Sequence, residues 1–149
     1  MTQLIFGKDE ELARWAEVTF PELGQIARPL HSIGLAGDDG NMLALALFNN
    51  FGQNARNETY DLQVTFVAAS TRWATKKSIR AFLHYPFFQI GANRMSALTN
   101  KSNKKARKLL EGLGFKLEGT HPYGDEGVRP SLSYGLYRDE AVKRWFPDG

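Results

Sequence analysis

The sequence predicts one α/β domain, with a mixed and mostly antiparallel central sheet flanked by helices. Two observations carry this prediction: strand-like apolar runs alternate with segments of helical periodicity, and turn-forming residues separate them. The length of 149 residues allows one hydrophobic core and is too short for two domains of ordinary size. We therefore assign residues 1–149 to a single domain.

The predicted elements place helices between strands along the whole chain. We predict strands at residues 3–6, 31–36, 42–48, 60–68, 94–99, 116–119 and 131–137, and helices at residues 8–20, 72–88, 103–113 and 139–145. Two connecting segments, residues 49–57 and residues 121–130, are rich in Gly and polar or charged residues. That composition predicts loops.

The first half of the chain predicts a helix followed by a hairpin. In residues 8–20, Leu12, Trp15 and Phe20 share one face, and acidic residues in the first turn favour the positive end of a helix. The turn-forming residues 37–41 between two apolar runs are typical of a β-hairpin. The second of these runs is apolar almost throughout, as in a strand covered on both faces.

The strand at residues 60–68 alternates between polar and apolar residues. Asp61, Gln63 and Thr65 share one face, and apolar or aromatic residues share the other. A polar face on a central strand is unfavourable unless polar groups lie against it. We therefore expect this face to line a cleft.

The helix predicted at residues 72–88 should end or kink at Pro86. The proline ring removes a backbone hydrogen bond and biases Tyr85 away from helical geometry. The short apolar run at residues 94–99 then predicts a strand.

The helix that ends at Leu113 is the clearest element. Its apolar stripe, at helical spacing, consists of Ala106, Leu109, Leu110 and Leu113. Asn100 or Ser102 can cap its start, and Gly114 fits its stop. Its other face carries the cations Lys101, Lys104, Lys105, Arg107 and Lys108. Free N–H groups at a helix start, surrounded by cations, favour a phosphate-rich ligand.

Composition excludes several kinds of site. The chain has no cysteine, which excludes disulfides, thiolate metal ligands and a cysteine nucleophile. Its three histidines lack metal-ligand spacing, so we expect no metal. The net charge of +3 is compatible with a polyanionic ligand but does not require one. No apolar run suits a membrane span and the first residues show no signal-peptide pattern, so we expect a cytoplasmic protein without a membrane partner.

The order and punctuation of these elements resemble the GNAT fold of acyl-CoA N-acyltransferases. The resemblance is most specific over residues 64–119, where Asn103, an amphipathic helix and Gly114 followed by Phe115 succeed one another as in the ribosomal-protein N-acetyltransferase branch. Residues 72–75 are similar to small GNAT proteins encoded by bacteriophages. The resemblance implies acetyl-CoA as co-substrate, an amine acceptor, and direct attack of the amine on the thioester.

The resemblance also implies which residues contact acetyl-CoA. The family holds the pyrophosphate on a loop that reads Gln/Arg-x-x-Gly-x-Gly/Ala, and the matching residues 72–77 contain no glycine. Cations in this stretch could compensate with charge. Asn103 matches the family's asparagine that contacts the pantetheine arm, while the residues alone predict an N-cap; both roles can coexist. The predicted co-substrate contacts are Phe66, Val67, Ala68, Arg72, Trp73, Ala74, Thr75, Lys76, Lys77, Asn100, Asn103 and Arg107.

The implied chemistry needs an oxyanion donor and a base. A backbone N–H near residues 66–68 would stabilise the oxyanion, and a carboxylate would deprotonate the ammonium. Asp61 is our candidate base, with Glu118 as the second carboxylate near the expected cleft, although a solvated or salt-bridged strand end also explains Asp61. Tyr137 borders the family's acceptor cleft and is our second catalytic candidate. The tyrosine that protonates the thiolate in many members is replaced by Leu110, which the apolar stripe assigns to the core.

Two interpretations from other classes stay open. One is a basic nucleic-acid-binding module, in which helix cations contact phosphates while Trp73, Tyr85 and Phe87 stack on bases. The other is a GNAT fold without catalysis that serves in binding or assembly. We favour the N-acetyltransferase, alone or as a homodimer, over both.

Overall fold

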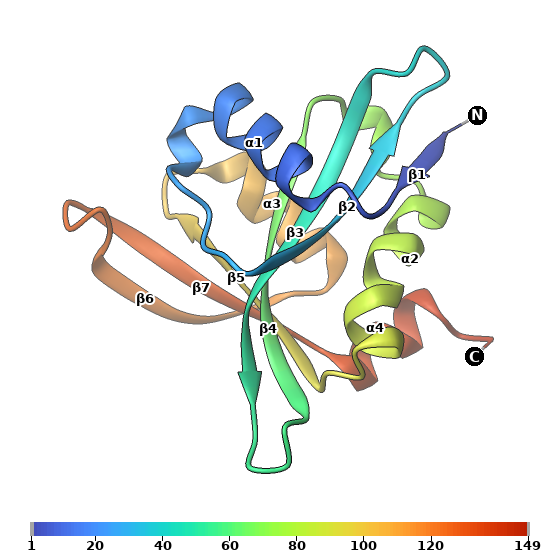
Figure 1. The fold of residues 1–149 in the computed structure, drawn as a ribbon. Helices are drawn as coiled ribbons and strands as arrows, with labels where there is room; N and C mark the ends of the chain where they lie inside the picture. The colour runs from blue at the N-terminus through green and yellow to red at the C-terminus, as the bar shows by residue number, and fades with distance from the viewer. Residues whose placement is uncertain (1, 149) are drawn as a thin grey trace.

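The computed structural model describes residues 2–148 as one sheet with helices on both faces (Figure 1). The strands are β1 (Gln3–Ile5), β2 (Leu30–Ala36), β3 (Met42–Gln53), β4 (Thr59–Ala68), β5 (Arg94–Asn100), β6 (Lys116–Asp125) and β7 (Arg129–Tyr137). The helices are α1 (Asp9–Thr19), α2 (Lys76–His84), α3 (Lys104–Leu113) and α4 (Arg138–Trp145), with short turns η1 (Pro21–Leu23), η2 (Thr71–Trp73) and η3 (Tyr85–Gln89). The predicted α/β class is confirmed.

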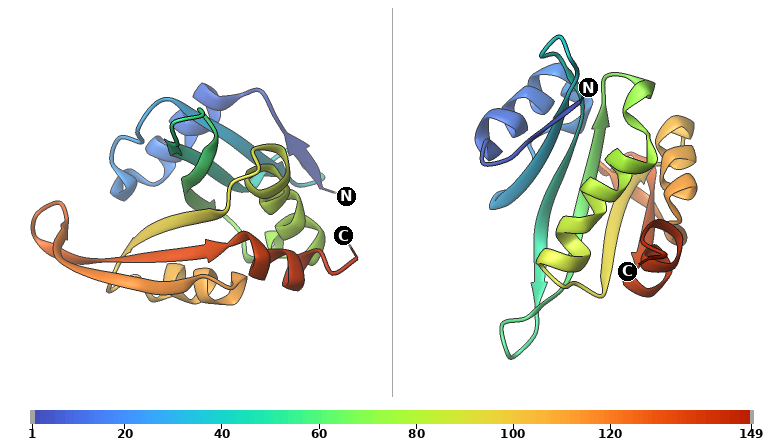
Figure 2. Two further views of the ribbon diagram at one scale, coloured as in Figure 1. Left: turned by 90° about the horizontal axis from the view of Figure 1, so that it is seen from below. Right: turned by 90° about the vertical axis from the view of Figure 1, so that its right-hand side faces the viewer.

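The seven strands lie in the order β1-β2-β3-β4-β5-β7-β6. Neighbouring strands are antiparallel except β4 and β5, which are parallel. Helix α1 lies on one face of the sheet, and α2, α3 and α4 lie on the other (Figure 2). No helix among the described residues has the length and apolar character needed to cross a membrane.

Each face of the sheet has its own hydrophobic core. Phe48, Leu62 and Tyr134 are fully buried in the larger core, on the side of α2, α3 and α4. Leu45 and Val67 are buried in the smaller core beside α1. Because β3 is covered on both faces, its first half reads as an unbroken apolar run, as the sequence predicted.

Helix α3 has the buried stripe that its periodicity predicts. Leu110 and Leu113 are 5% and 3% exposed, so the assignment of Leu110 to the core is confirmed. Gly114 ends the helix at φ 108°, the left-handed geometry that glycine allows. The N-cap is Asn103, whose side chain accepts the Ala106 N–H at 3.1 Å. The cap predicted at Asn103 is therefore confirmed, and the alternative cap at Asn100 or Ser102 is wrong.

Two segments predicted as loops, residues 49–57 and 121–130, are mostly strand, and the first keeps a turn at residues 54–57. Strand β3 continues to Gln53 through two register shifts against β4. Residues 121–130 belong mostly to β6 and β7, which meet at a turn where Glu126 and Gly127 have φ of 54° and 72°. Pairing with a partner strand satisfies the backbone hydrogen bonds even where the side chains are polar, so local composition misled the prediction.

The segment predicted as one helix at residues 72–88 is divided into three. The turn η2 comes first, and the hydroxyl of Thr75 then accepts the Ser78 N–H at 3.1 Å and caps α2. Helix α2 ends at His84, so the prediction that the helix ends or kinks at Pro86 is confirmed. The backbone widens into the π-turn η3, in which the Ile90 N–H donates to the Tyr85 carbonyl at 2.9 Å.

Candidate active site

The parallel strands β4 and β5 are paired over only three residues each and then separate. The last pair is Gln63 opposite Ser96. Beyond it the two strands diverge, as two viewing directions show (Figures 1 and 2). We call the stretch in which the end of β4 (residues 64–68) and the end of β5 (residues 97–100) are no longer paired with each other the gap.

Hydrogen bonds along β4 show which backbone groups face this gap. The Tyr60 carbonyl accepts the N–H of Asn93, the residue before β5, at 3.0 Å. The Leu62 carbonyl accepts the hydroxyl of Ser96 in β5 at 3.3 Å. Just past the end of β4, the Ala69 N–H donates at 2.8 Å to a carbonyl of β3 instead. Even-numbered residues of β4 therefore direct their backbone groups toward β5, and odd-numbered residues direct theirs toward β3.

Two backbone N–H groups consequently point into the gap. Phe66 and Ala68 lie beyond the last β4–β5 pair and face the side on which β5 has moved away. Val67, the residue between them, faces Leu45 of β3 and buries its side chain against α1. Of the three strand residues predicted to contact the co-substrate, the structure brings the N–H groups of two to the gap.

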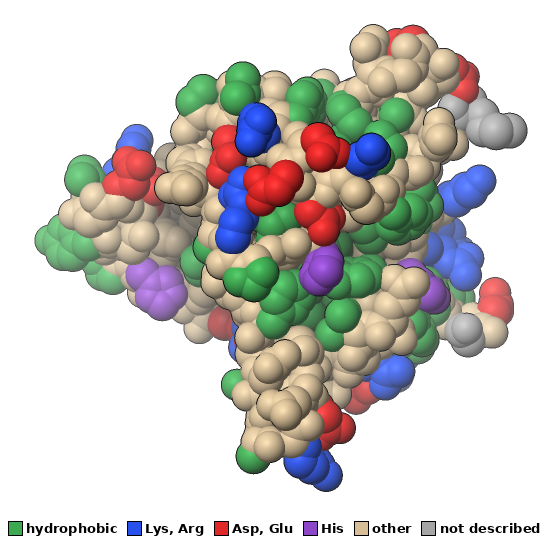
Figure 3. Space-filling model, in the orientation of Figure 1, with side chains coloured by type: hydrophobic (Ala, Val, Ile, Leu, Met, Phe, Trp, Pro, Cys, Tyr) green, Lys and Arg blue, Asp and Glu red, His purple; other side chains and the backbone are tan. Residues whose placement is uncertain are grey.

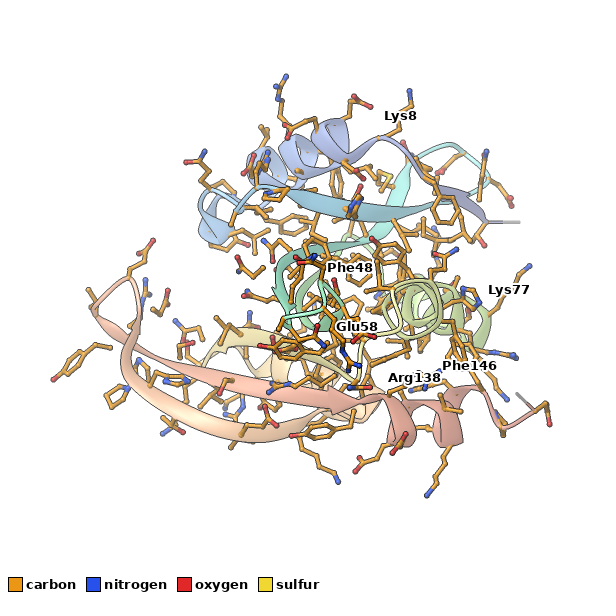
Figure 4. All side chains as sticks on the ribbon, turned by 60° about the horizontal axis from the view of Figure 1, so that its bottom comes forward. Lys8, Phe48, Glu58, Lys77, Arg138 and Phe146 are labelled. Atoms are coloured by element: carbon orange, nitrogen blue, oxygen red, sulfur yellow. The ribbon has the colours of Figure 1, made fainter. Side chains whose placement is uncertain are left out.

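The loop from β4 to α2 begins at the end of β4 that borders the gap. No residue from 69 to 77 has a positive φ, so the backbone of this loop does not require the glycines of the family pattern. The N–H groups of Lys76 and Lys77, in the first turn of α2, lack acceptors within the helix. Lys and Arg side chains project from the edge of the molecule beside α2, and Lys77 points away from the protein body (Figures 3 and 4).

The remaining residues of this loop that were predicted to contact the co-substrate lie in three different surroundings. Trp73 is 3% exposed and stacks on Phe66 in the core, so only its backbone can reach a ligand. Arg72 lines a hollow of about 290 Å³ together with Asp38 and Asp39 of the β2–β3 turn. Ala74 and Thr75 are exposed between them and α2.

The predicted contacts at the start of α3 already have partners in the protein. The Arg107 guanidinium donates to the Tyr134 hydroxyl at 3.3 Å and to the Lys101 carbonyl at 3.1 Å. Asn100, the last residue of β5, accepts the Ser102 N–H at 2.9 Å and donates its amide to Asp125. Asn103 caps the helix. All three residues lie where β5 gives way to α3, at the β5 side of the gap.

Asp61 and Tyr137 belong to a polar network on the sheet face opposite α2, α3 and α4. Arg94 contacts Asp61 at 3.4 Å and Glu118 at 2.7 Å, and the Tyr137 hydroxyl donates to Glu118. Burial raises the pKa of Asp61 against the opposing effect of Arg94, and the hydrogen bond to Glu118 raises the pKa of Tyr137. A Cβ at Gly135 would lie 2.6 Å from the Glu118 carboxyl, so the network needs a glycine beneath it.

This network lies at the paired end of the two strands. Asp61 is paired with Arg94, and Arg94 with Tyr137. Phe66 lies five positions after Asp61 along β4, which is about 16 Å along an extended strand. The structure therefore groups Asp61 with Tyr137, and it separates both from the N–H groups that face the gap.

A second hollow lies at the outer edge of β2, away from the gap. Its volume is about 360 Å³, and Asp9, His31 and Tyr85 are among the residues that line it. Asp9 accepts the N–H and the hydroxyl of Ser32 at 2.9 Å and 2.7 Å. Among residues 2–148, no group of three or more His, Asp or Glu residues could hold a metal ion.

Comparison with solved structures finds similar folds over almost the whole chain. A spermidine N-acetyltransferase SpeG from Vibrio cholerae, the F149G mutant, has a TM-score of 0.72 and 13% identity, with 96% of this chain and 97% of that chain covered. The ribosomal-protein-S5-alanine acetyltransferase from Vibrio fischeri has a TM-score of 0.68 and 11% identity, with 93% and 94% covered. No family model and no curated protein matches the sequence.

Proposed function

We propose that this chain, which has the GNAT fold, is an N-acetyltransferase that moves an acetyl group from acetyl-CoA to an amine. The observation that carries the proposal is the gap between β4 and β5, into which Phe66 and Ala68 direct unpaired N–H groups. Such donors match the requirement of acyl transfer, because the thioester oxygen gains negative charge when an amine attacks. The first turn of α2, with its free N–H groups and lysines, lies beside the same gap and suits a pyrophosphate.

The proposed roles follow from these positions. The backbone of residues 72–77, with Lys76 and Lys77, holds the pyrophosphate. Asn100, Asn103 and Arg107 flank the pantetheine arm at the opposite side of the gap. The thiolate leaves without an acid from α3, because Leu110 is buried in the core. Catalysis then rests on positioning the two reactants and on the preorganised N–H donors.

We assign the acceptor amine to the sheet face opposite α2 and α3. This face is polar along β4, β5 and β7, and it carries the network that contains Asp61 and Tyr137. The similar structures include enzymes named for spermidine and for the alanine of a ribosomal protein. A polyamine and a short peptide with a free N-terminal alanine are therefore suitable probes.

Calorimetry combined with an acetylation assay separates this proposal from its alternatives. We expect acetyl-CoA to bind with one site per chain, and a duplex oligonucleotide to give no comparable heat. A nucleic-acid-binding module would instead bind the duplex, with an affinity that falls steeply as salt rises. A GNAT fold without catalysis would acetylate no amine probe, whether or not it binds acetyl-CoA.

Reversing charge at the start of α2 should weaken acetyl-CoA binding. We expect Lys76→Glu combined with Lys77→Glu to raise the dissociation constant at least about tenfold, or roughly 1.4 kcal/mol. The matched control is Lys143→Glu with Arg144→Glu, which makes the same charge change on α4. Unchanged affinity in the α2 double variant would remove this helix start from the site.

The N-cap of α3 allows a test that separates capping from ligand contact. Asp caps a helix as well as Asn does, so Asn103→Asp should leave the melting temperature of the free protein unchanged. The same change sets a negative charge beside a polyanion and should reduce the rise in melting temperature that acetyl-CoA produces. Asn103→Ser is a second control, because Ser also caps a helix but its shorter side chain reaches less far toward a ligand. Equal shifts in wild type and Asn103→Asp would make Asn103 a cap and nothing more.

A further inference from the structure

The β6–β7 hairpin bends where its register shifts. His121 is paired with Ser131, but the next pair is Asp125 with Arg129, so β6 carries extra residues at this point. A Cβ at Gly124 would lie 2.8 Å from the Cβ atoms of His121 and Ser131, which only a glycine avoids. The bulge re-aims the strand beyond it, as β-bulges do. Asp125, directly after Gly124, is thereby turned toward the sheet.

Asp125 is fixed at the end of β5. The side-chain amide of Asn100 donates to its carboxylate, and Arg129 lies 3.6 Å from the same carboxylate. The carboxyl side chain keeps 31% of its surface exposed, so it is held in place but open to solvent. Two residues 25 positions apart in sequence thus meet at the point where β5 borders the gap.

The carboxylate is tied to the part of β5 that lies beyond the last β4–β5 pair, and the gap-facing N–H groups of β4 lie beyond the same pair. The last pair is Gln63 opposite Ser96, and Phe66 and Thr99 each lie three residues beyond it along their own strands. Asn100, which holds Asp125, is the next residue. Asp61 lies five residues of β4 before Phe66, about 16 Å along the strand.

Asp125 also lies on the sheet face proposed for the acceptor. Met95 and Ala97 of β5 are buried in the core on the side of α2 and α3. Side chains alternate along a strand, so Asn100 shares the opposite face with Arg94 and Ser96. A carboxylate held there faces an amine that approaches the gap from the side away from the co-substrate helices.

We propose that Asp125 is the group that takes the proton from the attacking amine. The inference rests on the proposed function. As the nitrogen bonds to the thioester carbonyl carbon, the nitrogen becomes acidic and the carbonyl oxygen gains charge near the Phe66 N–H. The nitrogen passes one proton to Asp125, the carbon–sulfur bond breaks, and the thiolate leaves and takes a proton from water. Asp125 then returns its proton to solvent through its exposed side.

The test uses the full chain with acetyl-CoA and the spermidine and alanine-peptide probes. Asp125→Asn should lower turnover about hundredfold, the usual size for loss of a proton acceptor. Its acetyl-CoA dissociation constant should stay within about twofold and its melting temperature should be unchanged, because an Asn side chain has the same size and still accepts the hydrogen bond from Asn100. Asp125→Glu should restore part of the turnover.

Glu126→Gln is the matched control, because it removes the same charge from the adjacent residue of the hairpin turn and should leave turnover intact. Wild-type turnover in Asp125→Asn would overturn the inference. Loss of turnover in Asp61→Asn but not in Asp125→Asn would overturn it too and would give the role to the network around Arg94. A wild-type chain that fails to bind acetyl-CoA would overturn the proposed function and the inference with it.

Discussion

Leu110→Ala should lower the free energy of unfolding by about 2–5 kcal/mol, the usual range for deleting a buried leucine side chain. Leu110 is 5% exposed and belongs to the core between the sheet and α2, α3 and α4. The substitution removes apolar contacts and leaves a cavity that the neighbours fill only in part. Urea denaturation followed by circular dichroism measures the change. Leu109→Ala, at a half-buried position of the same helix, should cost less.

The companion variant Leu110→Tyr introduces the tyrosine that many GNAT enzymes carry at the matching position. We expect it to destabilise the chain, because a larger ring and a hydroxyl group must enter a packed apolar core. We expect no gain in turnover. A stable variant with faster turnover would show that position 110 faces the gap, which would contradict its assignment to the core.

Ala68→Pro should lower turnover with acetyl-CoA about hundredfold, because it deletes one of the two N–H groups that point into the gap. Ala68 is exposed and its N–H faces away from β3, so the proline removes no hydrogen bond of the sheet. The variant should therefore fold. Turnover and the acetyl-CoA dissociation constant, measured on the same preparation, check the expectation.

Two controls make this result specific to the N–H group. Ala68→Val adds side-chain volume but keeps the donor, and it should retain most of the turnover. Val67→Pro removes the N–H that faces Leu45 of β3, and it should destabilise the sheet instead. Equal turnover in Ala68→Pro and Ala68→Val would show that this N–H takes no part in binding or catalysis.

The elements with strong local signals could be predicted from the sequence. Helix α3 repeats apolar residues at helical spacing and stops at Gly114, and the buried Leu110 follows from that repeat alone. The polar face of β4 followed from simple alternation. The α/β class followed from the order of such segments. In each case the periodicity of apolar residues within one segment determines which side chains are buried, so the sequence is sufficient to predict the structure.

Features that depend on distant pairing were missed. The β6–β7 hairpin was predicted as a loop because its residues are polar, yet β7 supplies the hydrogen bonds that make β6 a strand. Because of that error, Asp125 was not among the predicted site residues. Its position depends on the bulge at Gly124 and on Asn100, a residue of another strand. The tight bend at Gly124 is visible only in three dimensions. The same holds for the end of β4–β5 pairing, which no local pattern marks.

The central claim is that acetyl-CoA binds in the gap between β4 and β5. A titration of the ¹⁵N-labelled chain with acetyl-CoA, followed by amide chemical shifts, tests it most directly, because the shifts report both binding and place. We predict saturable shifts of the Phe66 and Ala68 amides and of the Lys76 and Lys77 amides at the start of α2. Absence of shifts at the gap, or shifts confined to the hollow beside Asp9 at the edge of β2, would contradict the claim.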